Sequence, residues 1–99
     1  MLVHSVYFWL KKTTSPADRA AFRKAMEGLT AIKAVVQMFV GEPAGTEEAG
    51  VIDNSFDFAL TALFKDRTAL DAYSTDPVHV ALVEKFAPMW QRVVVHDAQ

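Results

Sequence analysis

The sequence predicts an α+β domain of the ferredoxin-like class, a four-stranded antiparallel sheet with helices on one face. Two observations lead to this prediction. Segments rich in β-branched and aromatic residues, and segments with apolar residues at helical spacing, follow one another in the order β-α-β-β-α-β. The length of 99 residues suits one domain, so residues 1–99 are expected to form a single domain without internal repeats.

The first strand is predicted over residues 2–10, which are apolar on both alternating faces and should therefore be covered on both sides. The face expected to meet the helices carries His4, Val6, Phe8 and Leu10. A helix is predicted to begin after Ser15, because a serine caps the first turn and the proline that follows is tolerated there. The inner side of this helix carries Phe22, Ala25, Met26 and Leu29.

A second strand is predicted over residues 35–40, and a third over residues 56–64, where apolar residues alternate. The face of the third strand that is expected to be buried carries Phe56, Phe58, Leu60, Ala62 and Phe64. Residues 41–54 form a loop without periodicity. A loop of this length is typical of either a functional lid or a disordered segment, and both interpretations stay open.

A short helix is predicted after Asp66, with Leu70 and Tyr73 on its inner side. Asp76 is expected to cap a further helix that runs toward Trp90 and is bent or ended by Pro88. The last strand is predicted over residues 93–95.

The sheet face without helices is predicted to form an interaction surface, because it would otherwise expose apolar side chains. These side chains belong to Val3, Tyr7, Trp9, Ala59, Thr61 and Leu63. A second copy of the same sheet would cover them, so we expect a symmetric homodimer with facing sheets. Trp9 and Trp90 are interpreted as anchors of the core or of the dimer.

The composition excludes several functions. A net charge of -2 without a Lys/Arg cluster argues against binding to nucleic acid or to an anionic membrane surface. Without cysteine there is no disulfide, thiolate nucleophile or thiolate metal site, so the cytoplasm is the simplest compartment. The apolar run at residues 6–10 is too short to span a membrane.

Three groups that exchange protons are predicted to converge between the sheet and the helices. His4 lies on the inner face of the first strand, His79 begins the inner stripe of the last helix, and Tyr73 precedes it. A neutral imidazole accepts a proton near pH 7, and a phenol donates a hydrogen bond to a developing oxyanion. Both histidines are expected to be buried, either as satisfied core residues or as polar groups lining a pocket.

Other motifs of catalysis or metal binding are not found. His96 stands beside Asp97 and is interpreted as part of a solvated terminus. The histidines lack the spacing of HExxH, no cysteine is present, and a tightly bound zinc is therefore not expected. Neither a GxGxxG motif nor a P-loop occurs.

Several segments together resemble the stress-responsive dimeric α/β barrel (Dabb) family over essentially the whole chain. Tyr73, Pro77 and His79, together with the early His4, are the most specific. The other matching segments are Met1-Leu2-Val3, Val6-Tyr7-Phe8, Phe64-Lys65-Asp66 and Val94-Val95-His96-Asp97. The resemblance implies a ferredoxin-like protomer that pairs as a dimeric α/β barrel.

The resemblance also implies roles for these residues, since plant polyketide cyclases of this family have active-site residues at the same positions. His79 would be the general base that removes a proton between two carbonyls, Tyr73 would stabilise the enolate, and His4 would hold the substrate. Aldol-type ring closure would then need no cofactor. In some relatives, magnesium is bound by backbone carbonyls at the positions of Leu29, Ile32 and Val35.

The chain also departs from the family pattern. Asp76 stands where relatives often have a histidine. Met26 stands where the plant polyketide cyclase that this chain resembles has a pocket tyrosine, and this difference argues against a long alkyl polyketide as the substrate. We therefore expect a protein that binds a small, hydrophobic, carbonyl-bearing molecule, with cyclase-like or proton-transfer activity. A non-enzymatic stress-response protein and a cofactor-free monooxygenase are alternatives that the sequence leaves open.

Overall fold

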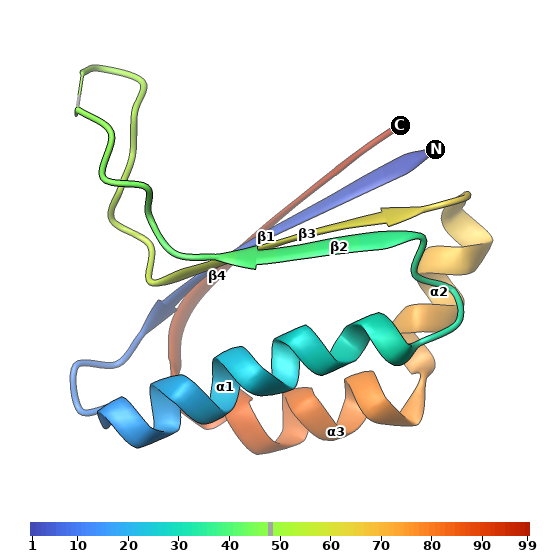
Figure 1. Ribbon diagram of the computed structural model, residues 1–99, viewed down its shortest axis with the longest axis horizontal. Coiled ribbons are helices and arrows are strands. Elements are labelled where there is room, and N and C mark those ends of the chain that lie inside the picture. The colour runs from blue at the N-terminus through green and yellow to red at the C-terminus, as the bar shows by residue number, and fades with distance from the viewer. Residues whose placement is uncertain (48) are drawn as a thin grey trace.

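The computed structural model describes residues 1–47 and 49–99, and it consists of a sheet with helices packed below one face (Figure 1). The helices α1 and α3 lie under the sheet, and α2 lies at one end (Figure 1). This arrangement confirms the predicted ferredoxin-like class. The elements are β1 (Leu2–Leu10), α1 (Pro16–Gly28), β2 (Gln37–Gly41), β3 (Phe58–Phe64), α2 (Arg67–Thr75), α3 (Pro77–Phe86) and β4 (Trp90–Ala98).

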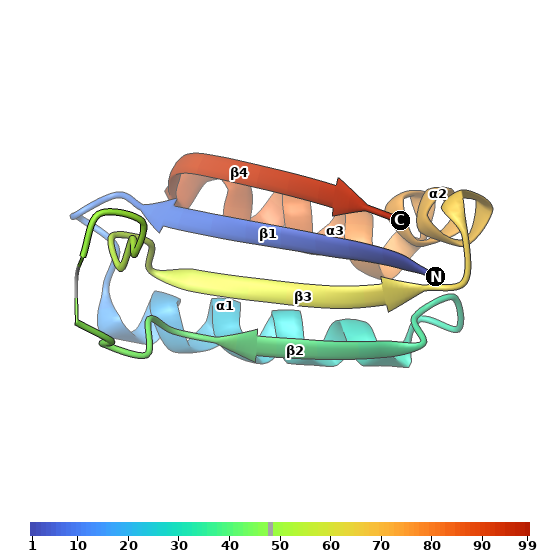
Figure 2. The same ribbon diagram turned by 90° about the horizontal axis from the view of Figure 1, so that it is seen from above.

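The strand order in the sheet is β2-β3-β1-β4, and each neighbouring pair is antiparallel (Figure 2). The central strands β1 and β3 alternate between the two faces, so every second residue points to the helices. Their inner side chains form the core together with α1 and α3. The largest fully buried side chains belong to Phe22, Met26, Leu29 and Phe64.

The helix starts are confirmed by side-chain caps. The Ser15 hydroxyl accepts a hydrogen bond from the Asp18 N–H at 3.0 Å. The Asp66 and Asp76 carboxylates accept from the first turns of α2 and α3, each at 2.9 Å. The last helix, α3, ends at Phe86, and Pro88 lies in a following 3-10 turn (Ala87–Met89), as expected for a helix that Pro88 bends or ends.

The strand boundaries differ from the predictions. β2 begins at Gln37 rather than at residue 35, although the Val36 N–H already donates to the Leu63 carbonyl at 2.9 Å. β4 extends over nine residues rather than three, because its backbone pairs along nearly all of β1, where side-chain polarity matters little.

The prediction that Phe56 lies on the buried face is wrong. β3 begins only at Phe58, so the alternation of the strand does not reach residue 56. The ring of Phe56 instead packs against Tyr7, with ring centroids 5.2 Å apart, on the sheet face that carries no helices.

The loop between β2 and β3 stands on the side of the sheet opposite the helices (Figure 1). Trp9 Nε1 donates to Ser55 Oγ at 3.0 Å, and the Asn54 amide donates to the Thr46 carbonyl at 2.7 Å. Ser55, directly after the predicted 41–54 loop, is thus held to the free face, whereas Glu42 at the start of the loop pairs with Arg23 of α1 at 2.9 Å. Residue 48 of that loop lies outside the described residues.

The free face of the sheet carries the apolar side chains that were predicted for it, and Phe39 on β2 joins them. Phe39 is paired with Thr61, so both project to this face, and Phe39 is 59% exposed. Arg92 stacks on Trp9, with the guanidinium carbon 4.5 Å from the ring centroid. Within the described ranges, no helix has the length and apolar character needed to cross a membrane.

Candidate functional site

A cavity of about 220 Å³ lies between the sheet and the helices, beside α3. Its polar side chains include all three predicted groups, His4 from β1, Tyr73 from α2 and His79 from α3. The rest of the wall is mostly apolar and includes Val6, Phe8, Met26, Leu60, Leu82 and Val93. The structure thus brings the three predicted residues around one apolar space.

Tyr73 contacts both imidazoles. Its ring centroid lies 4.6 Å from that of His79 and 6.1 Å from that of His4. The side chain of Tyr73 packs against Phe64 and the residue is only 2% exposed, so the phenol is held in place by the core. Tyr73 and His79 are six residues apart, on either side of the helix break at Asp76 and Pro77, so this contact is local in sequence.

The tautomer of His79 follows from its hydrogen bond. Its Nδ1 lies 3.0 Å from the backbone carbonyl of Ser74, near the end of α2. Because a carbonyl only accepts, Nδ1 must carry the proton and donate. Nε2 of the neutral ring then keeps its lone pair and is free to act as a base.

His4 has a similar arrangement with a side chain that the sequence analysis missed. Its Nδ1 lies 2.5 Å from Asp97 Oδ1, and an ionised carboxylate accepts the Nδ1 proton. The two residues face each other across the β1–β4 pair. Asp97 lies two residues beyond the predicted last strand (93–95), and only the longer observed β4 and its register with β1 place it opposite His4.

His96, the neighbour of Asp97, projects to the opposite face of the sheet. It pairs with Ser5, is exposed, and lies with its ring centroid 6.5 Å from that of Tyr7. His96 therefore does not join the cavity. Trp90 belongs to the partly buried shell of the core, whereas Trp9 lies on the free face.

The expectation that His4 and His79 are buried is wrong for the isolated protomer. Both are partly exposed, and the side chain of His4 is 14% exposed. The reason is that β4 is an edge strand, and its inward-facing Val93 and Val95 are 39% and 47% exposed. The cavity is thus open, and the histidines line it rather than fill a closed core.

Burial raises the pKa of Tyr73 to about 12. The hydroxyl therefore stays protonated at neutral pH and can donate a hydrogen bond. The folded state holds this proton more tightly than the unfolded state, in which a tyrosine has a pKa of about 10. The stability contributed by the neutral phenol is present below pH 10 and is lost as the pH rises toward 12.

Tyr73→Phe should therefore make stability less sensitive to alkali. From pH 8 to pH 11, the wild type should lose about 1.4 kcal/mol more of its free energy of unfolding than the variant. Urea unfolding followed by circular dichroism at the two pH values measures this difference. Tyr7→Phe serves as the matched control, and equal losses in wild type and Tyr73→Phe would contradict the assignment.

The backbone carbonyls expected to bind magnesium lie on the turns that follow α1. Those of Leu29 and Ile32 already accept hydrogen bonds from the N–H groups of Ile32 and Val35, each at 3.0 Å, which leaves one lone pair on each oxygen. Within residues 1–47 and 49–99, no group of three or more His, Asp or Glu side chains is placed to hold a metal. Magnesium usually has carboxylate ligands as well, and binding by these carbonyls stays a prediction.

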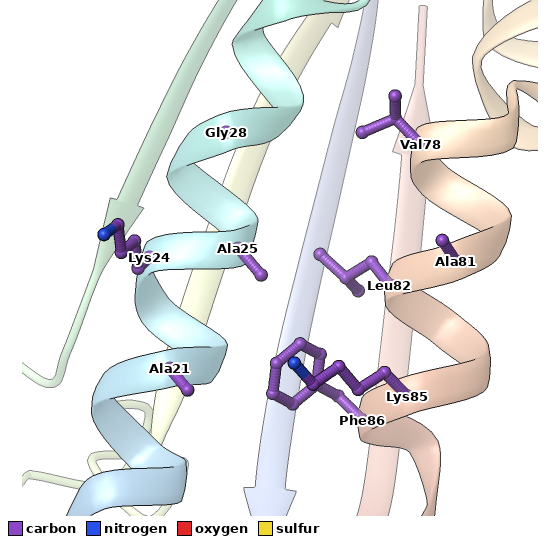
Figure 3. A pocket seen from close by; sticks show the side chains of 9 residues that line it. All are labelled: Ala21, Lys24, Ala25, Gly28, Val78, Ala81, Leu82, Lys85 and Phe86. Carbon is purple, nitrogen blue, oxygen red and sulfur yellow. The ribbon is translucent and has the colours of Figure 1, made fainter.

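Another hollow, of about 440 Å³, lies between α1 and α3 on the outer side of the helical layer (Figure 3). Small side chains such as Ala21, Ala25 and Ala81 line it, and Lys85 extends beside the ring of Phe86 (Figure 3). None of its lining residues is a histidine, tyrosine or carboxylate. The three candidate groups, His4, Tyr73 and His79, therefore all lie in the smaller cavity.

The four-stranded antiparallel sheet with helices on one face defines a ferredoxin-like α+β protein, and its cavity holds two histidines and a tyrosine. The chain belongs to the stress responsive A/B barrel domain (Dabb) family, whose model matches residues 2–99. No curated protein matches the sequence.

Solved structures with the same fold cover nearly the whole chain. A Dabb family protein with a ferredoxin-like fold from Mesorhizobium loti is 25% identical, with a TM-score of 0.78 and coverage of 99% of this chain and 94% of that one. A dimeric ferredoxin-like protein of unknown function from Thermobifida fusca is 23% identical, with a TM-score of 0.82 and coverage of 98% and 88%. A hydroxynitrile lyase from Passiflora edulis is 17% identical, with a TM-score of 0.82 and coverage of 98% and 90%.

Proposed function

We propose that this protein binds a small hydrophobic carbonyl compound in the cavity beside α3 and catalyses proton transfer next to the carbonyl without a cofactor. The observation that carries the proposal is the hydrogen bond from His79 Nδ1 to the Ser74 carbonyl, which leaves Nε2 basic beside an apolar cavity. The cavity volume of about 220 Å³ lies below the usual range of about 300–1,000 Å³ for ligand pockets, which suits a compact ketone.

In the proposed reaction, His79 Nε2 removes a proton from the carbon next to the carbonyl. The electron pair of the broken C–H bond moves toward the carbonyl oxygen and forms an enolate. The Tyr73 hydroxyl, which is neutral because its pKa is about 12, donates a hydrogen bond to this oxygen. The proton then returns from His79 to carbon.

A substrate with a second carbonyl would give aldol-type ring closure by the same steps. The enolate carbon attacks the second carbonyl carbon, and the resulting alkoxide takes the proton from His79. His4, whose Nδ1 is held by Asp97, offers Nε2 as an acceptor for a substrate hydroxyl. The hydroxynitrile lyase with the same fold supports only the point that this fold accommodates an enzyme active site.

Butyrophenone is a suitable probe, because it is a compact aryl ketone whose C2 protons exchange slowly in neutral water. We expect the protein to accelerate the exchange of these protons for deuterium in D₂O, as followed by proton NMR. Absence of a protein-dependent rate would contradict the proposed catalysis. Binding of butyrophenone without exchange would instead favour the non-enzymatic alternative.

We further propose that the protein is a homodimer in which the two free sheet faces meet. The support is the apolar character of this face, including the exposed Phe39, and the loop that is held on the same side. Three proteins with the same fold are described as dimeric, from Thermobifida fusca, Bacteroides fragilis and Jannaschia. The cavity with His79 lies on the other side of the sheet and stays accessible in such a dimer.

A further inference from the structure

A second hollow, of about 490 Å³, adjoins the cavity at the end of the sheet where β1 begins and β4 ends. We call it the outer hollow. It shares His4 and Ser74 with the cavity, so the two spaces meet at these residues. Its other polar lining residues include Arg67 and Asp71 from α2 and Asp97 from β4, whereas the cavity is mostly apolar.

The volumes indicate that a ligand larger than a compact ketone would use both spaces. Sites for small organic ligands typically measure about 300–1,000 Å³. The cavity alone, at about 220 Å³, is smaller than this range, and the outer hollow adds about 490 Å³. A ligand larger than a compact ketone must therefore extend past His4 into polar surroundings.

Arg67 is the arginine of the outer hollow, and its guanidinium forms no ion pair with any residue that the structure describes. The ion pairs found in residues 1–47 and 49–99 involve His4, Arg19 and Arg23, and none involves Arg67. Of the two carboxylates in the lining, Asp97 is held by His4, and Asp71 is not in ion-pair distance of any described cation. A guanidinium matches the geometry of a carboxylate and binds it with two parallel hydrogen bonds.

We propose that Arg67 selects substrates that carry a carboxylate on a short chain attached to the carbonyl-bearing part. The apolar part of such a substrate fills the cavity, the carbonyl lies near His4 and His79, and the acidic end reaches the outer hollow. This inference rests on the proposed function and narrows its substrate class to amphipathic carbonyl acids. Asp71 and Asp97 also line the outer hollow, and both carboxylates counteract the charge of Arg67 and thus limit the strength of this selection.

Two probes that differ only at the tail test the proposal. 5-Oxo-5-phenylpentanoate carries a carboxylate, and 5-oxo-5-phenylpentanamide carries a neutral amide of nearly the same shape. By isothermal titration calorimetry, the wild type should bind the acid about tenfold more tightly than the amide, because hydrogen bonds to charged groups are the stronger ones. Arg67→Gln should bind both probes equally.

Two control variants separate Arg67 from general charge effects. Asp71→Asn should keep or increase the preference for the acid, and Lys85→Gln, which removes a cation from the outer side of the helices, should leave it unchanged. Equal affinities in the wild type, or a preference that persists in Arg67→Gln, would overturn the proposal. Butyrophenone lacks the tail and tests the cavity alone. If butyrophenone binds but the acid and the amide bind equally, only this inference is overturned. If none of the three probes binds, the proposed function is overturned too.

Discussion

His79→Ala should slow the exchange of the butyrophenone C2 protons by about 10²–10⁴, the usual contribution of a general base. The loss should appear in the exchange rate at saturating ketone, since the variant leaves most of the apolar wall in place. The side chain is only partly buried and its hydrogen bond reaches a carbonyl near a helix end, so the fold should persist. Proton NMR in D₂O measures the rate, and circular dichroism checks the fold.

His96→Ala is the matched control for this prediction. His96 is an exposed histidine on the opposite face of the same sheet, and its removal should leave the exchange rate unchanged. An equal loss in both variants, or an unchanged rate in His79→Ala, would remove His79 from the mechanism.

Phe39→Glu should weaken the proposed dimer by at least about a hundredfold in its dissociation constant. In a dimer with facing sheets, the substitution buries an unpaired carboxylate in each protomer, which costs several kcal/mol per ion. Each loss of about 1.4 kcal/mol raises the dissociation constant tenfold. The free energy of folding of the protomer should change little, because Phe39 is 59% exposed there. Sedimentation velocity at micromolar concentration gives the mass.

Val78→Glu introduces the same charge at a comparably exposed position, since Val78 is 50% exposed on α3. This variant should stay dimeric, because α3 lies on the opposite side of the sheet from the proposed interface (Figure 2). A monomeric wild type, or a Phe39→Glu variant that stays dimeric like Val78→Glu, would contradict the facing-sheet dimer.

Local chemistry accounts for the parts of the fold that were predictable. The caps at Ser15, Asp66 and Asp76 depend on residues within three positions of the helix start, so the sequence identifies them. The contact between Tyr73 and His79 was predictable for a similar reason, because one short helix break separates them. Phe56 was misplaced because alternation was extended beyond the true start of β3.

The remaining features of the site depend on the strand register and on which strands form the edges of the sheet, and neither can be predicted from a local sequence pattern. Asp97 meets His4 only because β4 pairs with β1 across 93 positions of sequence. The exposure of both histidines depends on the edge position of β4. Arg67 gains its proposed role from the outer hollow, which forms where α2 meets the ends of β1 and β4.

The most direct test of the proposed site is a long-range proton–nitrogen NMR spectrum of the imidazoles, recorded with and without butyrophenone. The free protein should show His4 and His79 as the Nδ1–H tautomer, and the ketone should shift the Nε2 signals of both while those of His96 stay unchanged. The Nε2–H tautomer at His79, or shifts confined to His96, would contradict the assignment of His79 as the base in a ligand-binding cavity.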